Sequence, residues 1–230
     1  DPSGNFIWAK SSGSTNADRS VAIALDNSAN VYTTGYFQGN VDFDPGINSF
    51  PLTGPGGISL FIQKLDLNGN FVWAKTTGSS TNETRGADIC IDANGNSYVT
   101  GTFSGTTDFD PGAGVQNLAT SGLQDVFVLK TDPDGNTLWA KKLGGTAAEF
   151  GNSITTDAFS NVYTTGRFRG TADFDPGSGT FSLTSSGNED VFVSKLDSDG
   201  NFSWAVSAGG PNYDEGNSIL VDNQIGRAHV

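Results

Sequence analysis

Pairs of aspartates two residues apart are the side chains in this sequence best suited to chemistry. The pentapeptide Asp-Phe-Asp-Pro-Gly occurs three times, and no basic residue adjoins any of its carboxylates. Carboxylate oxygens are ligands that Ca²⁺ prefers, and backbone carbonyls and water would complete its shell of about six to eight oxygens. One hypothesis is therefore a calcium site at each copy. Its candidate ligands are Asp42 and Asp44, Asp108 and Asp110, and Asp173 and Asp175.

The same motif also fits a purely structural role. Asp44-Pro45-Gly46 has the residue types of a tight turn, with Phe43 packed inward and Asp42 accepting backbone hydrogen bonds. Each copy offers only two side-chain donors and lacks the third acidic position and the distal Glu of an EF-hand loop. The pattern favours the structural role and leaves calcium as the alternative.

Other catalytic chemistry has few candidates. The single histidine, His229, lies near the end of the chain, and the single cysteine, Cys90, stands in an apolar run typical of a buried, inert thiol. A hydrolase would have to use carboxylates, and a catalytic pair needs two unlike environments. Acidic residues that recur identically in every unit cannot provide these two different environments. Two arginines of the third unit, Arg167 and Arg169, break the symmetry and could bind a carboxylate or, as we favour, balance acidic neighbours.

The motif recurs every 65 or 66 residues, and the other landmarks keep the same step. A Trp-Ala dipeptide and an Asp-x-x-Gly-Asn turn both return with it. This period indicates a repeat architecture. The predicted domain is a repeat fragment spanning residues 1–224, with units 1–65, 66–131, 132–196 and a partial unit 197–224. Because the chain contains no Met, we expect a fragment of a longer protein, and residues 225–230 are interpreted as a non-native tail resembling sequencing-adapter read-through.

Each unit contains four short runs with strand character. Asp- and Asn-rich turns join the first run to the second and the third to the fourth, which predicts an antiparallel meander of strands A, B, C and D. In the second unit these runs are residues 87–91, 97–103, 126–130 and 137–142.

Run C is apolar on both faces, so both faces must be covered. Stacking four-stranded sheets around an axis achieves this, and the crowded inner strand A is accordingly rich in small residues. The predicted fold class is all-β: a partial β-propeller of about three complete four-stranded blades. Single strands of incomplete blades are expected at residues 6–10 and 218–221.

This meander places the long B to C and D to A connections on one face. The D to A connections carry Asp18, Glu83, Glu149 and Asp214, so we expect that face to be acidic. The aligned tryptophans are expected to fill the space between blades, with sugar stacking as the alternative.

The charge and hydropathy of the sequence limit the kinds of partner that the chain can bind. The formal net charge of −13 argues against nucleic acid, which binds positive surfaces. The sequence has no run of about 18 apolar residues, so no transmembrane segment is expected.

The repeat resembles a known family. Residues 190–205 read Asp-Val-Phe-Val-x-Lys-Leu-Asp-x-Asp-Gly-Asn-x-x-Trp-Ala, and Asn-Val-Tyr-Thr-Thr-Gly-x-Phe begins at Asn30 and Asn161. In these motifs the chain resembles the SBBP-type β-propeller repeats of bacterial secreted and cell-surface proteins, in a subtype marked by Asp-Phe-Asp-Pro-Gly. The resemblance implies a repeat scaffold, often part of a longer secreted chain, and no defined activity.

These observations predict a non-enzymatic, extracellular β-propeller scaffold or interaction module of a bacterial secreted or cell-surface protein. The remaining blades of the same chain, and a protein or glycan ligand on the acidic loop face, are the expected partners. The alternative is a carbohydrate-active enzyme or lectin-like binder whose specific residues lie in missing blades.

Overall fold

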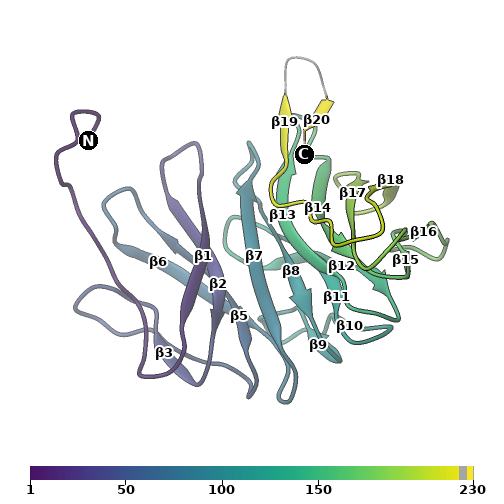
Figure 1. Cartoon of the computed structure of the whole chain (residues 1–230). Helices are drawn as coiled ribbons and strands as arrows, with labels where there is room; N and C mark the ends of the chain where they lie inside the picture. The colour runs from purple at the N-terminus through teal and green to yellow at the C-terminus, as the bar shows by residue number, and fades with distance from the viewer. Residues whose placement is uncertain (223–226, 230) are drawn as a thin grey trace.

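The computed structural model describes residues 1–222 and 227–229, and every regular element within them is a β-strand. Three blades follow one another along the chain (Figure 1), each an antiparallel sheet in the order A-B-C-D. The prediction of an all-β, partial propeller is confirmed. Blade 1 contains β1 (Arg19–Leu25), β2 (Val31–Phe37), β5 (Ser59–Leu65) and β6 (Phe71–Thr77). Blade 2 contains β7 (Thr84–Ile91), β8 (Ser97–Phe103), β11 (Asp125–Thr131) and β12 (Thr137–Gly145). Blade 3 contains β13 (Phe150–Thr156), β14 (Val162–Phe168), β17 (Asp190–Leu196) and β18 (Phe202–Ala208). The described residues include no helix that could cross a membrane.

The inner strands β1, β7 and β13 run side by side (Figure 1). Glycines in strand A also let it pack closely on strands B and C of the preceding blade. A Cβ on Gly86 would lie 2.7 Å from Leu60 Cδ1, and one on Gly151 would lie 2.8 Å from Val126 Cγ1. A larger residue at either position would therefore push side chains of the preceding blade aside.

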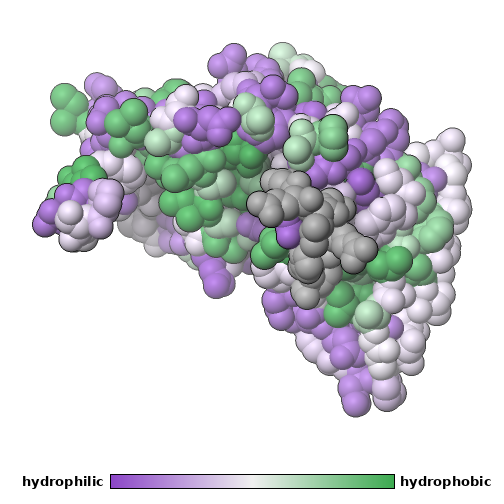
Figure 2. Space-filling view, turned by 90° about the horizontal axis from the view of Figure 1, so that it is seen from above, coloured by the Kyte–Doolittle hydropathy of each residue, from purple (hydrophilic) through white to green (hydrophobic). Residues whose placement is uncertain are grey.

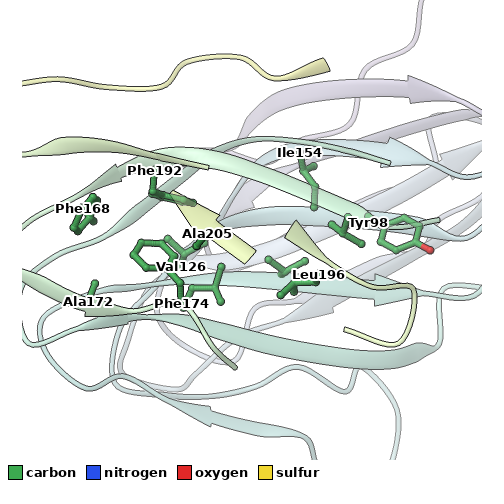
Figure 3. Close-up of a cluster of buried hydrophobic side chains, with 12 residues drawn as sticks. Tyr98, Val126, Ile154, Phe168, Ala172, Phe174, Phe192, Leu196 and Ala205 are labelled. Carbon is green, nitrogen blue, oxygen red and sulfur yellow. The ribbon is translucent and has the colours of Figure 1, made fainter. Parts of the chain in front are cut away.

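The hydrophobic core lies between blades. Blade 1 contributes Leu60 and Ile62, which pack against Phe127 and Ile89 of blade 2. The next interface repeats the arrangement (Figure 3), where Phe168, Phe174 and Phe192 of blade 3 gather near Val126 of blade 2. Each blade therefore buries its apolar faces only with the help of its neighbours.

An aspartate closes each hairpin turn. Asp92 Oδ1 accepts the backbone N–H groups of Asn94 and Asn96 at 2.9 and 3.0 Å, and Asp92 Oδ2 accepts the Tyr98 hydroxyl at 3.0 Å. Burial alone would raise the pKa of Asp92, but these bonds outweigh it and hold that pKa below its usual range. In the first A to B turn Ala29 has a left-handed φ of 59°, so the Asp26 carboxylate holds this turn without glycine.

The tryptophans connect each blade to the next. Trp73 Nε1 donates to Pro133 O at 3.0 Å, and Trp139 Nε1 donates to Ser198 O at 3.2 Å, each in the C to D turn of the following blade. Gly135 has a left-handed φ of 80°, and a Cβ there would lie 3.0 Å from Trp73 Cζ3. These half-buried indoles therefore lie in the space between blades.

Both predicted single strands at the ends differ from expectation. Residues 6–10 are extended but have no assigned strand, because no neighbouring strand pairs with them. The strand expected at 218–221 is the shorter β19 (Leu220–Asp222), which pairs with β20 (Arg227–His229) instead of a strand B. Of the tail expected at 225–230, residues 225, 226 and 230 lie outside the described residues.

We expect Trp139→Ala to lower the free energy of unfolding by about 3 kcal/mol, because it removes a ring contact with Tyr98 inside blade 2 and the hydrogen bond to Ser198 O of blade 3. Urea denaturation measures this. Leu138→Ala is the matched control: its side chain is 51 % exposed, so it should cost about 0.5 kcal/mol or less. Equal effects of the two substitutions would contradict the interblade role of the indole.

Candidate functional site

Each Asp-Phe-Asp-Pro-Gly segment forms one end of a small hairpin on the loop face, defined here as the face that carries the B to C and D to A connections. Both short strands of each hairpin lie within the long B to C connection of their blade. The hairpins are β3 (Asn40–Asp42) with β4 (Pro51–Thr53), β9 (Thr106–Asp108) with β10 (Asn117–Ala119), and β15 (Thr171–Asp173) with β16 (Ser182–Thr184).

The paired aspartates are anchored to their own backbone. Asp108 Oδ1 accepts the N–H groups of Asp110 and Gln116 at 3.0 and 2.8 Å, and Asp110 Oδ1 accepts the Gly112 N–H at 2.7 Å. The other copies repeat these bonds at Asp42, Asp44, Asp173 and Asp175. In the first copy the Phe50 N–H, above all, holds the pKa of Asp42 below its usual range.

Calcium would have to bind through the remaining oxygens of these pairs. Across residues 1–222, no group of three or more acidic, histidine or cysteine side chains lies together as a metal ligand set. Two carboxylates that each already bond backbone N–H groups are a poor match for a cation that takes about six to eight oxygens. Calcium binding at Asp42, Asp44, Asp108, Asp110, Asp173 and Asp175 stays a prediction.

The motif hairpins also join successive blades. In the ladder between β12 and β15, Gly144 pairs with Asp173 and Gly145 with Ala172, so strand D of blade 2 continues into the hairpin of blade 3. The bridge between Gly78 and Asp108 occupies the same place one blade earlier. The first aspartate of each motif therefore helps to fix the spacing between blades.

Solvent-facing grooves lie where strand D ends against the next hairpin. One has a volume of about 400 Å³ and is lined by Ser12, Asp42 and Asp44, among others. Its counterpart between blades 2 and 3, two interfaces further on, has about 330 Å³ and is lined by Lys142, Asp173 and Asp175. We call these the motif grooves. They present paired carboxylates at repeated positions.

The acids of the D to A connections mostly turn inward. Glu149 Oε2 accepts the Gly145 N–H and Asp214 Oδ2 accepts the Gly210 N–H, both at 2.8 Å, and Asp18 accepts the Ser14 N–H in the same way. These carboxylates hold their own loops. The expectation that they make the loop face acidic is therefore not supported, because one oxygen of each of these three carboxylates bonds the backbone of its own loop.

Glu83 does not occupy the position expected for it. Gly86 lies eight positions after Gly78, whereas Gly151 lies seven positions after the matching Gly144, so the second unit has one extra residue. Thr84 consequently takes the buried place, and Glu83 lies at the surface with Arg85 at 3.1 Å.

Arg167 balances charge, as favoured from the sequence. Its guanidinium pairs with Glu189 at 2.7 Å and with Glu215, and it lies over the Phe150 ring. These contacts join blade 3 to the segment that follows it. Arg169 is exposed.

A buried carboxyl pair between blades 2 and 3 was not predicted. Asp125 and Glu149 are both fully buried, and Asp125 Oδ1 and Glu149 Oε1 have no hydrogen-bond donor. Burial, followed by the nearby Asp125, raises the pKa of Glu149 to about 7, so the two carboxyls share a proton below that pH. Lys142 Nζ lies 3.4 Å from Asp125 Oδ2. Little in the sequence indicates this pair. Strand C begins with an acidic residue in units 2 and 3 and with Ser59 in unit 1.

Such a pair is chemically suited to proton transfer but cannot meet a substrate here, because neither carboxyl reaches solvent. Cys90 is equally unsuited to catalysis, since burial raises the pKa of its thiol.

No family model matches this sequence. It is similar to an uncharacterized WD repeat-containing protein, L264, of Acanthamoeba polyphaga mimivirus, with 26 % identity over 231 residues. The match covers 89 % of this chain but only 16 % of the viral protein, so the chain spans a small part of that relative. WD repeats are themselves four-stranded propeller blades, which agrees with the fold.

We expect Asp108→Ala to lower the free energy of unfolding by about 2 kcal/mol, because two backbone N–H groups lose their acceptor. Chemical denaturation in chelator and in millimolar calcium should give the same loss. The control is Asp134→Ala on the opposite face, where we expect little change. A melting temperature that calcium raises in the unmodified chain, but not in a variant with Asp44→Asn, Asp110→Asn and Asp175→Asn together, would instead establish calcium binding at the motif.

Glu149→Gln should stabilise the protein at alkaline pH. The pKa of Glu149 lies at about 7 in the folded protein, above its ordinary 4.5, so the wild type loses stability as pH rises through this interval. A glutamine amide can donate to Asp125 at every pH. The advantage of the variant should grow from pH 5 to pH 8 and reach about 2 kcal/mol in denaturation curves. The exposed Glu83→Gln is the control. A difference that does not change with pH would contradict the shared proton.

Proposed function

We propose that this chain is part of a non-enzymatic β-propeller interaction module that contacts its partner through the motif grooves of the loop face. The supporting observation is repetition. Similar solvent-facing grooves with paired carboxylates recur at the first and third blades, at Asp42 and Asp44 and at Asp173 and Asp175. Several weak sites on a rigid scaffold bind a repeating or multi-site partner more tightly than any one site does.

The partner class follows from the chemistry of the grooves. Carboxylates, hydroxyls and, in the groove between blades 2 and 3, Lys142 can hydrogen-bond to the polar surface of a protein or to the hydroxyls of a glycan. Similarity to a WD repeat-containing protein supports the interaction role. The resemblance to SBBP-type repeats supports an extracellular or cell-surface location in a bacterium, which we include in the proposal.

We do not favour the carbohydrate-active enzyme. Its strongest candidate pair, Asp125 and Glu149, is sealed between two blades. A lectin-like binder remains within the proposal as the glycan branch.

The experiment is a binding screen of the purified chain on a glycan array and against extracellular protein fractions. Asp44→Asn with Asp110→Asn and Asp175→Asn changes one carboxylate in each motif. We expect this triple variant to reduce binding about tenfold or more, because the changes add across repeated sites.

A matched variant changes carboxylates of the opposite face. Asp134→Asn with Asp199→Asn lies in two exposed C to D turns and should keep full binding. Equal loss in both variants, or unchanged binding in the loop-face variant, would remove the proposed contact face. If no glycan on the array binds, a glycan partner is excluded. The protein fractions then decide whether the partner is a protein.

A further inference from the structure

Blade 1 has an apolar face that nothing covers. Ile23 of β1 is 68 % exposed, whereas Ile89 and Ile154, which hold the same place in blades 2 and 3, are 4 % and 3 % exposed. Figure 2 shows hydrophobic side chains gathered on the side of the molecule that carries β1 and β2. A groove of about 300 Å³ lies here, between Trp8 and Lys10 on one side and Ile23, Val31 and Phe61 on the other. We call it the open groove.

The two other interfaces indicate what such a face receives. Ile89 of blade 2 packs with Tyr32 and Ile62, from strands B and C of the preceding blade. Ile154 of blade 3 packs with Tyr98 and Val128 in the same manner. A face of this repeat is therefore complementary to a Tyr and aliphatic side chains on strands B and C of another such repeat.

A single strand can occupy part of this arrangement. Ile219, the counterpart of Ile23 in the segment after blade 3, packs against Tyr163 and Val193 and is 5 % exposed. The contact between blades thus forms even where the following blade contributes only its strand A.

The N-terminal segment already has the form of an outer strand. Residues 6–10 read Phe-Ile-Trp-Ala-Lys, against Phe-Val-Trp-Ala-Lys in β6. Trp8 Nε1 donates to Leu67 O of blade 1 at 3.2 Å, as the other indoles do to the blade that follows each of them. The edge of this segment that would pair with a strand C lies open. Phe6 is 82 % exposed, whereas its counterpart Phe71 packs against the Phe50 ring of its own blade.

The turn before this segment is also formed. Asp1 Oδ1 accepts the Asn5 N–H at 2.8 Å, and the Asp1 amine donates to Asn5 O at 2.9 Å. In the turn between β5 and β6 the backbone N–H of Asp66 donates to Asn70 O at 2.8 Å. A residue joined to Asp1 would therefore begin a strand running back along residues 6–10.

We propose that the open groove seats strands A, B and C of one further repeat of the same polypeptide, joined through the turn at Asp1, with residues 6–10 as strand D of that blade. This assignment does not depend on the proposed function.

The test adds such a repeat to the chain. Residues 149–196 are placed directly before Asp1, so that Leu196 is joined to Asp1 as it is to Asp197. We expect hydrogen exchange of the amides in β1 to slow about tenfold or more, in a protein that remains monomeric by light scattering. Unchanged exchange in β1, or an added segment that exchanges as unfolded chain, would overturn the proposal. A dimer of the unextended chain with protected β1 amides would assign the groove to a second copy and overturn it too.

Two further variants separate docking from folding. In the extended protein, Val191→Asp with Val193→Asp in the added copy alone should abolish the protection of β1 while blades 1 to 3 stay folded. Ile23→Asp should do the same from the other side, whereas Val115→Asp, at a side chain 73 % exposed in a loop of blade 2, should not. If the β1 amides of the extended protein stay protected from exchange after Ile23→Asp, the added repeat does not bind in the open groove.

Discussion

The structure depends on one constraint: a blade of this repeat has two apolar faces and cannot cover either of them alone. Leu60 and Ile62 are buried only because Ile89 and Phe127 of the next blade lie against them. Stability is consequently a property of the interfaces, as in other repeat proteins. The tryptophans, the inner-strand glycines and the motif hairpins all lie at these interfaces, and their recurrence every 65 or 66 residues reflects the recurrence of one contact.

The acidic composition has a structural origin that charge counting does not reveal. Asp26, Asp92 and Asp157 each bond two backbone N–H groups of a hairpin turn, and the aspartates of the motif do so in the long connections. In these turns and connections the carboxylates accept backbone N–H groups that no neighbouring strand pairs with. Much of the net charge of −13 therefore belongs to turn chemistry.

Sequence reasoning found the twelve long strands because their alternation and turn residues are local signals. It missed β3, β9 and β15 because three-residue strands are held by tertiary pairing, as in the contact of Asp173 with Gly144. It predicted a strand at residues 6–10, where the pattern is right but the pairing partner is missing. The carboxyl pair of Asp125 and Glu149 escaped notice because its members, 24 positions apart, belong to different blades. Glu83 was misaligned by a single inserted residue.

The residues at the buried joints between blades differ from one joint to the next, whereas the carboxylates of the motif recur in every blade. Ser59 and Thr84 fill the joint between blades 1 and 2, and Asp125 and Glu149 fill the equivalent joint between blades 2 and 3. Since both pairs are buried, this variation changes how two blades hold together and offers nothing to a ligand. The surface instead repeats the same carboxylates at each motif. These repeated carboxylates fit the proposed binding by several similar contacts, because each groove would add a similar increment of affinity.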